Sequence, residues 1–277
     1  MNLNAKGRLL SFGHGYSARE LATRLVGWQI TGTHRDRDTI WPGTDMRPFL
    51  DAADHLLISI APDADGDPVL RALGDEIAAR AGQYRWVGYL STTGVYGDRA
   101  GGWVDESAEL RPSTRRGQWR QAAEAAWQAV PALPLHIFRL AGIYGPGRGP
   151  FAKVRAGTAR RIVKPGQVFS RIHVADIATV LAASITVPNP GAIYNVCDDD
   201  PQPPEVVIAE AARLLGLPPP PEEDFETAEM SAMARSFYAE SKRVSNTRIK
   251  AELGVKLRYP GYRDGLAALL RDETGSP

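Results

Sequence analysis

Short apolar runs alternate with amphipathic stretches through most of the chain. The runs over 56–60 and 86–90 show no polar alternation, which is typical of strands covered on both faces. Apolar side chains at a 3.6-residue spacing over 17–26 and 69–77 predict helices, the second capped by Asp67 and opened by a proline. Strands separated by helices predict right-handed crossovers and a doubly wound parallel sheet, which is the α/β Rossmann architecture.

The same pattern predicts the remaining elements. Further strands are expected over 9–12, 29–33, 135–140 and 193–196, and further helices over 174–185, 246–253 and 261–271. Pro218–Pro221 predicts a stiff extended linker. We therefore expect a dinucleotide-binding Rossmann domain over 1–165, its sheet completed by a strand near 192–197, and a small C-terminal substrate lobe within 166–277.

A glycine-rich loop follows the first predicted strand and opens a helix. Gly13-His14-Gly15-Tyr16-Ser17-Ala18 has the pattern G-x-G-x-x-A. Glycine permits the tight turn and lets backbone N–H groups approach a pyrophosphate at the positive end of the helix. A glycine-rich turn without a ligand is the alternative. We assign to cofactor binding the residues Gly13, His14, Gly15, Tyr16 and Ser17.

The end of the second strand indicates which dinucleotide is bound. The acidic residue that would hold the ribose hydroxyls of NAD is missing, and Arg35 is placed to meet a 2′-phosphate, so NADP is favoured over NAD. Two alternatives remain: Arg35 and Arg37 are solvated loop charges, or Asp36 holds the ribose because the strand ends later. Ala61 and Ser91 are assigned to the same cofactor site.

Further motifs occur in a fixed order along nearly the whole chain. They are the glycine loop, Ser91-Thr92-Thr93-Gly94-Val95-Tyr96-Gly97-Asp98, Arg139-Leu140-Ala141-Gly142-Ile143-Tyr144-Gly145-Pro146-Gly147-Arg148, Arg171-Ile172-His173-Val174-Ala175-Asp176-Ile177-Ala178, Ile193-Tyr194-Asn195-Val196 and Glu252-Leu253-Gly254. Together they resemble the extended short-chain dehydrogenase/reductase superfamily, of the NAD(P)-dependent epimerase/dehydratase type. The resemblance implies a Rossmann domain with a C-terminal substrate lobe, and substrates that are usually nucleotide-linked sugars. The family's first loop glycine falls at Phe12 and its last at Ala18.

The resemblance also implies roles at the active site, and the chain departs from the family there. Thr92 matches the Ser or Thr that hydrogen-bonds the reacting oxygen, although a strand-end threonine paired to backbone is the alternative. Counting back from Glu124, the family's catalytic tyrosine and lysine fall at Arg116 and Arg120. The chain therefore resembles the atypical extended members, whose catalytic pair is degraded.

Arg116 and Arg120 lie on a further predicted helix. Arginine changes the chemistry of that helix, because a guanidinium stays protonated under any protein condition. Arg116 cannot act as acid or base, but it can clamp an anion or stabilise a developing alkoxide. Arg116 and Arg120 lie four residues apart on one helical face, which is alternatively a solvated face shared with Glu124. Candidate surrogate acids near strand ends are Tyr96, Tyr144 and His173. The last two are also assigned to substrate binding.

Charge is unevenly distributed along the chain. No Asp or Glu occurs from Ala125 through Ala175, a stretch that carries eight cations, whereas the segment after Cys197 opens with three aspartates. We expect this stretch to draw in an anionic substrate or to hold cofactor phosphates, with Arg148 and Arg171 as individual contacts. A solvated basic surface is the alternative.

The composition narrows the classes of function. A net charge of +1 gives no reason to expect a nucleic acid or membrane surface as partner, and no apolar run approaches membrane-spanning length. The single Cys197 excludes an internal disulfide framework, and residues 1–6 lack the apolar core of a secretory signal. We therefore expect a cytoplasmic protein without a metal site, and the sequence leaves its oligomeric state open.

Two classes of function follow. The first is an atypical NADP-binding oxidoreductase or epimerase-like protein that acts on a small anionic or nucleotide-linked substrate. If it transfers hydride, Thr92 orients the substrate oxygen and the proton comes from another side chain or from water. The second is a catalytically silent NADP-binding sensor or scaffold, which substrate-dependent turnover distinguishes from the first.

Overall fold

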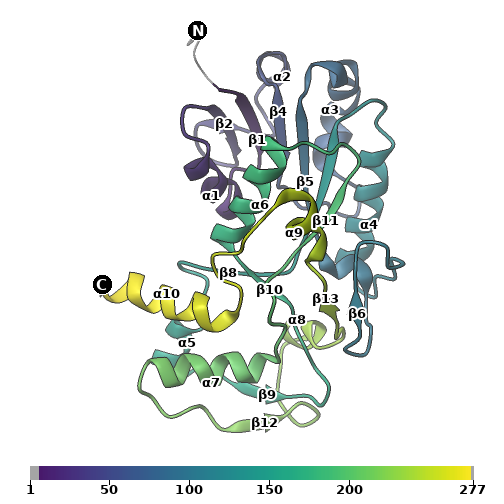
Figure 1. Ribbon diagram of the computed structural model, residues 1–277. Helices are drawn as coiled ribbons and strands as arrows, with labels where there is room; N and C mark the ends of the chain where they lie inside the picture. The colour runs from purple at the N-terminus through teal and green to yellow at the C-terminus, as the bar shows by residue number, and fades with distance from the viewer. Residues whose placement is uncertain (1–5, 276–277) are drawn as a thin grey trace.

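The computed structural model describes residues 6–275 and has a parallel sheet at its centre (Figure 1). Within the described residues this sheet has seven strands, in the spatial order β11 (Ile193–Val196), β7 (Leu135–Leu140), β5 (Trp86–Thr92), β4 (His55–Ile58), β1 (Arg8–Phe12), β2 (Gln29–His34) and β3 (Thr39–Ile40). All neighbouring strands are parallel. The order reverses between β1 and β4, which opens a ligand-binding crevice at the carboxyl ends of the strands. The predicted Rossmann fold is confirmed.

Helices cover both faces of the sheet (Figure 1). One layer contains α1 (Tyr16–Arg24), α6 (Val174–Thr186) and, beside β11, α9 (Thr247–Leu253). The other layer contains α2 (Arg47–Ala52), α3 (Pro68–Ala79) and α4 (Arg115–Gln128). Because successive side chains of a strand point to opposite faces, Leu9 packs into the first layer and Leu10 into the second.

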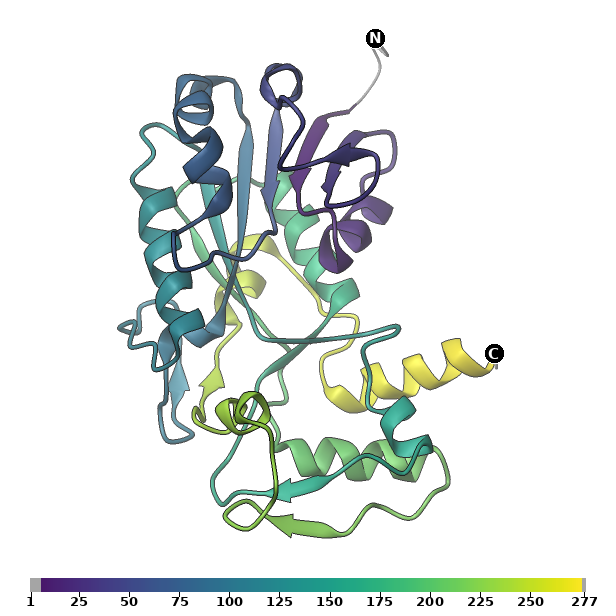
Figure 2. The same cartoon turned by 180° about the vertical axis from the view of Figure 1, so that it is seen from behind.

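A smaller lobe lies beyond the carboxyl ends of the strands, and Figure 2 shows it from behind. It contains α5 (Phe151–Arg155), α7 (Pro204–Leu214), α8 (Ala232–Phe237), α10 (Tyr262–Thr274) and the paired strands β9 (Arg161–Val163) and β12 (Glu222–Asp224). Its core is formed by side chains such as Phe151, Val207 and Leu266. Short parallel pairs join β8 (Gly142–Tyr144) to β10 (Arg171–His173) and β6 (Trp103–Val104) to β13 (Arg243–Val244). The remaining elements are the 3₁₀ turns η1 (Ala81–Gln83) and η2 (Thr93–Tyr96).

The chain does not divide between these units at residue 165. Helix α5 and strand β9 precede that residue but belong to the lobe, because β9 pairs with β12 and α5 packs on α7. Helix α6 follows it but belongs to the Rossmann layers, because it packs on α1. Strand β11 pairs with β7 and completes the sheet, as predicted for a strand near 192–197. None of the described helices is both long and apolar enough to cross a membrane. Residues 1–5, which bear on the predicted lack of a secretory signal, lie outside the described residues.

Candidate functional site

The glycine loop joins β1 to α1 in a tight turn. Gly13 has a φ of +78°, and a Cβ there would lie 2.8 Å from Ile60 Cγ1, so the position requires glycine. The Gly13 N–H donates to Thr33 Oγ1 at 2.9 Å, and the His14 N–H donates to the Thr33 carbonyl at 3.0 Å. These bonds fix the loop against the end of β2.

Gly15 leaves open space at the start of α1. A Cβ on Gly15 would have the Gly13 carbonyl oxygen, 3.8 Å away, as its nearest described neighbour. The first-turn N–H groups of Tyr16, Ser17 and Ala18 have no intrahelical acceptor, as in any α-helix. No side chain caps this helix end either, so these groups are available to a ligand. An open cradle of amides at the positive end of a helix fits a pyrophosphate.

The residues expected at the other cofactor contacts lie at the same sheet edge. Strand β2 ends at His34, one residue later than predicted, and the exposed Arg35 follows it directly. Asp36 lies one residue further along the loop and is also exposed. Ala61 follows the carboxyl end of β4 and is exposed. Arg35 and Ala61 therefore both follow carboxyl ends of strands in the sheet, and their contact with a cofactor stays a prediction.

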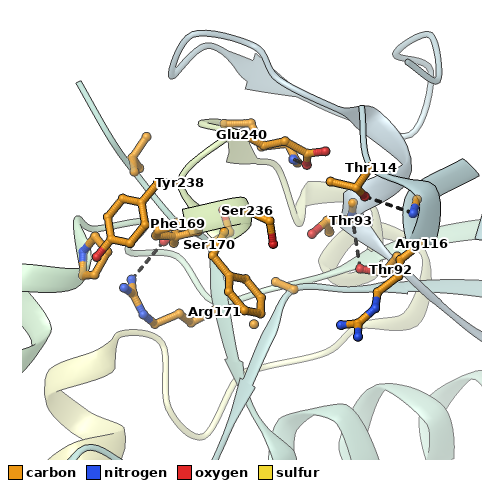
Figure 3. Close-up of a pocket in the computed structure, with 18 of the residues that line it drawn as sticks. Thr92, Thr93, Thr114, Arg116, Phe169, Ser170, Arg171, Ser236, Tyr238 and Glu240 are labelled. Carbon is orange, nitrogen blue, oxygen red and sulfur yellow. Dashed lines mark hydrogen bonds and ion pairs between the residues drawn. The ribbon is translucent and has the colours of Figure 1, made fainter. Parts of the chain in front are cut away.

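A cavity of about 950 Å³ lies between the carboxyl end of β5 and the lobe (Figure 3). Its sheet-side wall includes Thr92, Thr93, Gly94, Thr114, Arg115 and Arg116. Its lobe-side wall is largely apolar and includes Ile162, Val168, Phe169, Met230, Phe237 and Tyr238. The glycine-loop residues do not line it, so the cavity is separate from the phosphate cradle.

Thr92 lies at the cavity with its hydroxyl partly occupied. It is the last residue of β5, and its Oγ1 accepts the Gly94 N–H at 3.2 Å, which caps η2. The backbone-paired alternative is thus correct, yet the residue still lines the cavity. A hydroxyl that accepts one hydrogen bond retains its own proton to donate.

The two arginines of α4 occupy different surroundings. Arg116 is exposed, lines the cavity, and has no hydrogen bond or ion pair with another described residue. Arg120 is half-buried, and its Nη1 donates to Tyr89 Oη at 3.0 Å and to the Leu90 carbonyl at 2.9 Å. Only Arg116 of the two lines the cavity. The two side chains therefore do not hold one anion between them there, although they share a helical face. Figure 3 shows Arg116 and Arg171 on opposite sides of the cavity.

A buried polar network occupies the core behind the cavity. The Glu124 carboxylate accepts hydrogen bonds from the Ser91 hydroxyl and from Arg139 Nη2, the latter at 2.8 Å. Tyr96 Oη accepts from Arg139 Nη1 at 2.9 Å and donates to Asn195 Oδ1 at 2.7 Å. Glu124 is therefore not on a solvated face. The Ser91 and Tyr96 hydroxyls are occupied in this network, which argues against Tyr96 as a proton donor, while a cofactor contact of Ser91 stays a prediction.

The other two surrogate acids are also unsuited to proton donation. Tyr144 lines the cavity, but its Oη is buried against Gly265, and burial raises the pKa of Tyr144 far above its usual range. His173 caps α6 by accepting the Ala175 N–H at Nδ1, 3.2 Å away. Burial lowers the pKa of His173 to about 4, so the ring is neutral at physiological pH. His173 does not line the cavity.

The two predicted substrate arginines lie at separate places. Arg171 lines the cavity, and its Nη1 donates to the carbonyls of Phe169 at 3.0 Å and Gln202 at 2.7 Å. Arg148 does not line the cavity, and its guanidinium carbon lies 4.5 Å from the centre of the Tyr16 ring. The prediction that Arg148 contacts substrate is therefore wrong for this cavity.

The carboxylate-free stretch does not face the cavity as a unit. Of its eight cations, Arg171 is the one that lines the cavity in the described part of the chain. Carboxylates from distant segments neutralise half of the eight, in the pairs Arg139–Glu124, Arg155–Glu273, Arg160–Glu223 and Arg161–Glu222. Folding therefore brings carboxylate partners from elsewhere in the chain to half of these cations.

Comparisons with known proteins identify the family. No protein-family model matches the chain. Protein YeeZ of Escherichia coli (strain K12) is 30% identical over 273 residues, which cover 90% of this chain and 94% of YeeZ. The chain belongs to the YeeZ family. A 3-diazoavenalumate denitrifying reductase of Streptomyces sp. is 29% identical over 180 residues, 59% of this chain and 58% of that protein.

Solved structures place this family in the extended short-chain dehydrogenase/reductase superfamily. A functionally unknown conserved protein from Silicibacter pomeroyi DSS is 62% identical with a TM-score of 0.91, over 97% of this chain and 99% of that one. A putative NAD-dependent epimerase/dehydratase from Methylobacillus flagellatus is 25% identical with a TM-score of 0.73, over 97% and 99%. The human epimerase family protein SDR39U1, solved with NADPH, is 17% identical with a TM-score of 0.75, over 96% and 99%, and shows the shared fold.

The YeeZ-family chain keeps its phosphate cradle despite two departures from the superfamily's loop. Phe12 stands at the first glycine position but is fully buried and packs edge-on against Trp41, with ring centres 5.5 Å apart. Ala18 stands at the last glycine position and is also fully buried. Both side chains point into the core, so neither fills the space in front of Gly15.

Sequence reasoning missed an ion pair in the cavity wall. Lys242 Nζ donates to Glu240 Oε2 at 2.6 Å and to the Gly97 carbonyl at 2.8 Å. Both side chains line the cavity together with Phe237 and Tyr238. No local motif marked these residues, because they reach the cavity only when the segment around β13 folds back beside β6.

Proposed function

We propose that this chain is an NADP-dependent reductase that transfers hydride to a small anionic substrate without a tyrosine acid. The observation that carries the proposal is the charge of the cavity. Arg115 and Arg116 are exposed there and have no described carboxylate partner. Glu240, the carboxylate among the described lining residues, is already paired with Lys242. Cations left without partners in a cavity favour an anionic ligand.

The cofactor follows from the cradle and from the end of β2. The open space at Gly15 fits a pyrophosphate, and Arg35 supplies a cation where an NAD-specific protein would carry a carboxylate. Human SDR39U1, which shares the fold, was solved with NADPH. Arg35 is the feature that supports NADP over NAD, because other structures that share the fold, such as MoeE5, were solved with NAD.

The side chains at the cavity suggest a division of roles. When bound, the nicotinamide would supply hydride to the substrate. Thr92 would donate its hydroxyl proton in a hydrogen bond to the reacting group, and Arg116 would bind the substrate's carboxylate or phosphate. Because Tyr96, Tyr144 and His173 are not placed to give a proton, the favoured substrate is one whose reduction takes no proton from them.

The name of one relative supports this choice. The Streptomyces protein is a denitrifying reductase named for a diazo acid anion. Where the diazo group reacts as a diazonium, its carbon gains hydride while neutral dinitrogen departs with the C–N bonding pair, so this step requires no proton from the protein. A diazo acid also carries the negative charge that Arg116 would bind. We therefore favour anions with an electrophilic carbon of this kind over nucleotide-linked sugars.

The experiment measures NADPH oxidation with a panel of substrates. The panel contains diazo acids, keto acids and cyclic imine acids, each beside its neutral ester or amide, and a set of nucleotide-linked sugars. We expect turnover with one class of anion. Arg116→Met should raise KM for that anion at least tenfold, since a charge-assisted contact is lost, and leave its neutral analogue unchanged. Arg263→Met removes an exposed arginine of α10 outside the cavity and serves as control.

Three outcomes decide between the alternatives. Turnover of anions with the stated Arg116→Met effect supports the proposal. Preferential turnover of nucleotide-linked sugars would support the reductase activity but contradict the proposed class of substrate. Tight NADPH binding with no turnover of any panel member would favour the catalytically silent sensor or scaffold instead.

A further inference from the structure

The segment after β8 folds back over the glycine loop. The Gly145 N–H donates to the Arg148 carbonyl at 3.2 Å, and the Arg148 N–H donates to the Gly145 carbonyl at 2.8 Å. Gly145 has a φ of +150°, and a Cβ there would lie 2.5 Å from Tyr16 Oη. Tyr16 approaches this turn so closely that the position requires glycine.

Tyr16 joins the turn to the first helical turn of α1. Its Oη donates to the Pro146 carbonyl at 2.9 Å, and burial raises the pKa of Tyr16, which keeps that proton in place. The guanidinium of Arg148 stands over the Tyr16 ring at 4.5 Å, a cation–π contact. Since Tyr16 is the first residue of α1, this contact places the Arg148 guanidinium over a side chain of the first turn of that helix.

This arrangement brings two positive features together. Arg148 is exposed and has no ion pair with a described carboxylate, and the first turn of α1 contains no acidic residue. The N-terminal amides of a helix and a guanidinium both favour an anion, and each is unfavourable for the other when none is present. A phosphate bound between them would relieve that repulsion and satisfy both sets of donors.

We infer that Arg148 is a cofactor-binding residue that, with the first-turn amides of α1, binds the pyrophosphate of the dinucleotide. Tyr16 acts as a positioning residue for it. A planar guanidinium suits two phosphate oxygens at once, which gives the site orientation as well as charge. The inference rests on the proposed use of NADP. It assigns Arg148 to cofactor binding, whereas the sequence had suggested a contact with the substrate.

The test compares two ligands on Arg148→Gln. NADPH contains the pyrophosphate, whereas adenosine 2′-monophosphate contains the 2′-phosphate end alone. By titration calorimetry, Arg148→Gln should bind NADPH at least about tenfold more weakly than the unmodified protein and bind adenosine 2′-monophosphate equally well. Lys153→Gln removes an exposed charge five residues along the chain and should leave both affinities unchanged.

Variants of Tyr16 test the positioning role. Tyr16→Phe keeps the ring under Arg148 and should bind NADPH within about threefold of the unmodified protein. Tyr16→Leu removes the ring and should weaken NADPH binding. Combined with Arg148→Gln it should cost little more than Arg148→Gln alone, because the two act as one unit.

Two results would overturn the inference while leaving the proposed function intact. One is unchanged NADPH affinity in Arg148→Gln. The other is an equal loss of affinity for both ligands in Arg148→Gln and Lys153→Gln, which would indicate a general electrostatic attraction and no specific contact of Arg148. Failure of the unmodified protein to bind NADPH would instead overturn the proposed function, and this inference with it.

Discussion

Replacing Glu124 by glutamine tests whether the buried network behind the cavity stabilises the fold through charge. The side chains of Arg139 and Glu124 are only 4% and 3% exposed, and Nη2 lies 2.8 Å from Oε2. Glutamine keeps the shape but removes the counter-charge, which leaves the guanidinium buried and unpaired. Breaking such a pair from one side costs about 3–5 kcal/mol. Because glutamine still accepts one hydrogen bond, we expect a loss of about 3 kcal/mol, the lower end.

The assay is urea unfolding followed by circular dichroism, with calorimetry for Tm. At roughly 2–4 °C per kcal/mol for a chain of this size, Tm should fall by about 6–12 °C. Glu109→Gln is the control, since its pair with Arg111 is 67% and 63% exposed, so solvent screens the two charges and Tm should stay nearly unchanged. The double variant Glu124→Gln, Arg139→Met should recover part of the loss, because no charge stays buried. A Glu124→Gln variant as stable as Glu109→Gln would refute the reasoning.

Three further predictions follow from the same geometry. Gly15→Val should abolish dinucleotide binding in calorimetry with Tm unchanged, whereas Gly82→Ala, also open around its Cβ, should change neither. Arg35→Ala should erase most of an at least tenfold preference for NADP over NAD, and equal affinities in the unmodified protein would contradict the assignment. Burial raises the pKa of Asp198 from 3.8 to about 8, so the folded protein keeps a proton that the unfolded chain releases, and stability falls as pH rises through that window. Asp198→Asn should therefore raise Tm more at pH 8 than at pH 5, and equal shifts would count against this explanation.

The sequence predicted the central fold because the signals for its elements are local. The apolar run at 86–90 became β5, and the capped amphipathic stretch after Asp67 became α3. Helix α7 was missed although its buried residues Val207 and Ala211 lie four positions apart, as on one face of a helix. The boundary at residue 165 failed because pairing of β9 with β12 depends on contacts between segments far apart in the chain.

The site was predictable only where one short segment carries it. The glycine loop lies between a strand and a helix that are its neighbours in the sequence, and the pattern G-x-G-x-x-A is typical of such a turn. The roles of Ser91, Tyr96 and Glu124 were not predictable, because a buried network and an active site both place polar residues at strand ends. The contact of Arg148 with Tyr16 joins residues that are 132 positions apart, so no short sequence pattern could predict it.

Pairing separates the arginines that hold this fold from those available to a ligand. Arg139 is a buried cation that donates to the Glu124 carboxylate and to the Tyr96 hydroxyl, so its charge is satisfied within the protein. Arg116 and Arg148 have no described carboxylate partner, one in the cavity and the other over the glycine loop. Arg148 has a cation–π contact with Tyr16, but no described carboxylate neutralises the charge of either side chain. We therefore propose Arg116 for the substrate anion and Arg148 for the cofactor phosphates, because an anion bound at either would neutralise a charge that no described carboxylate neutralises.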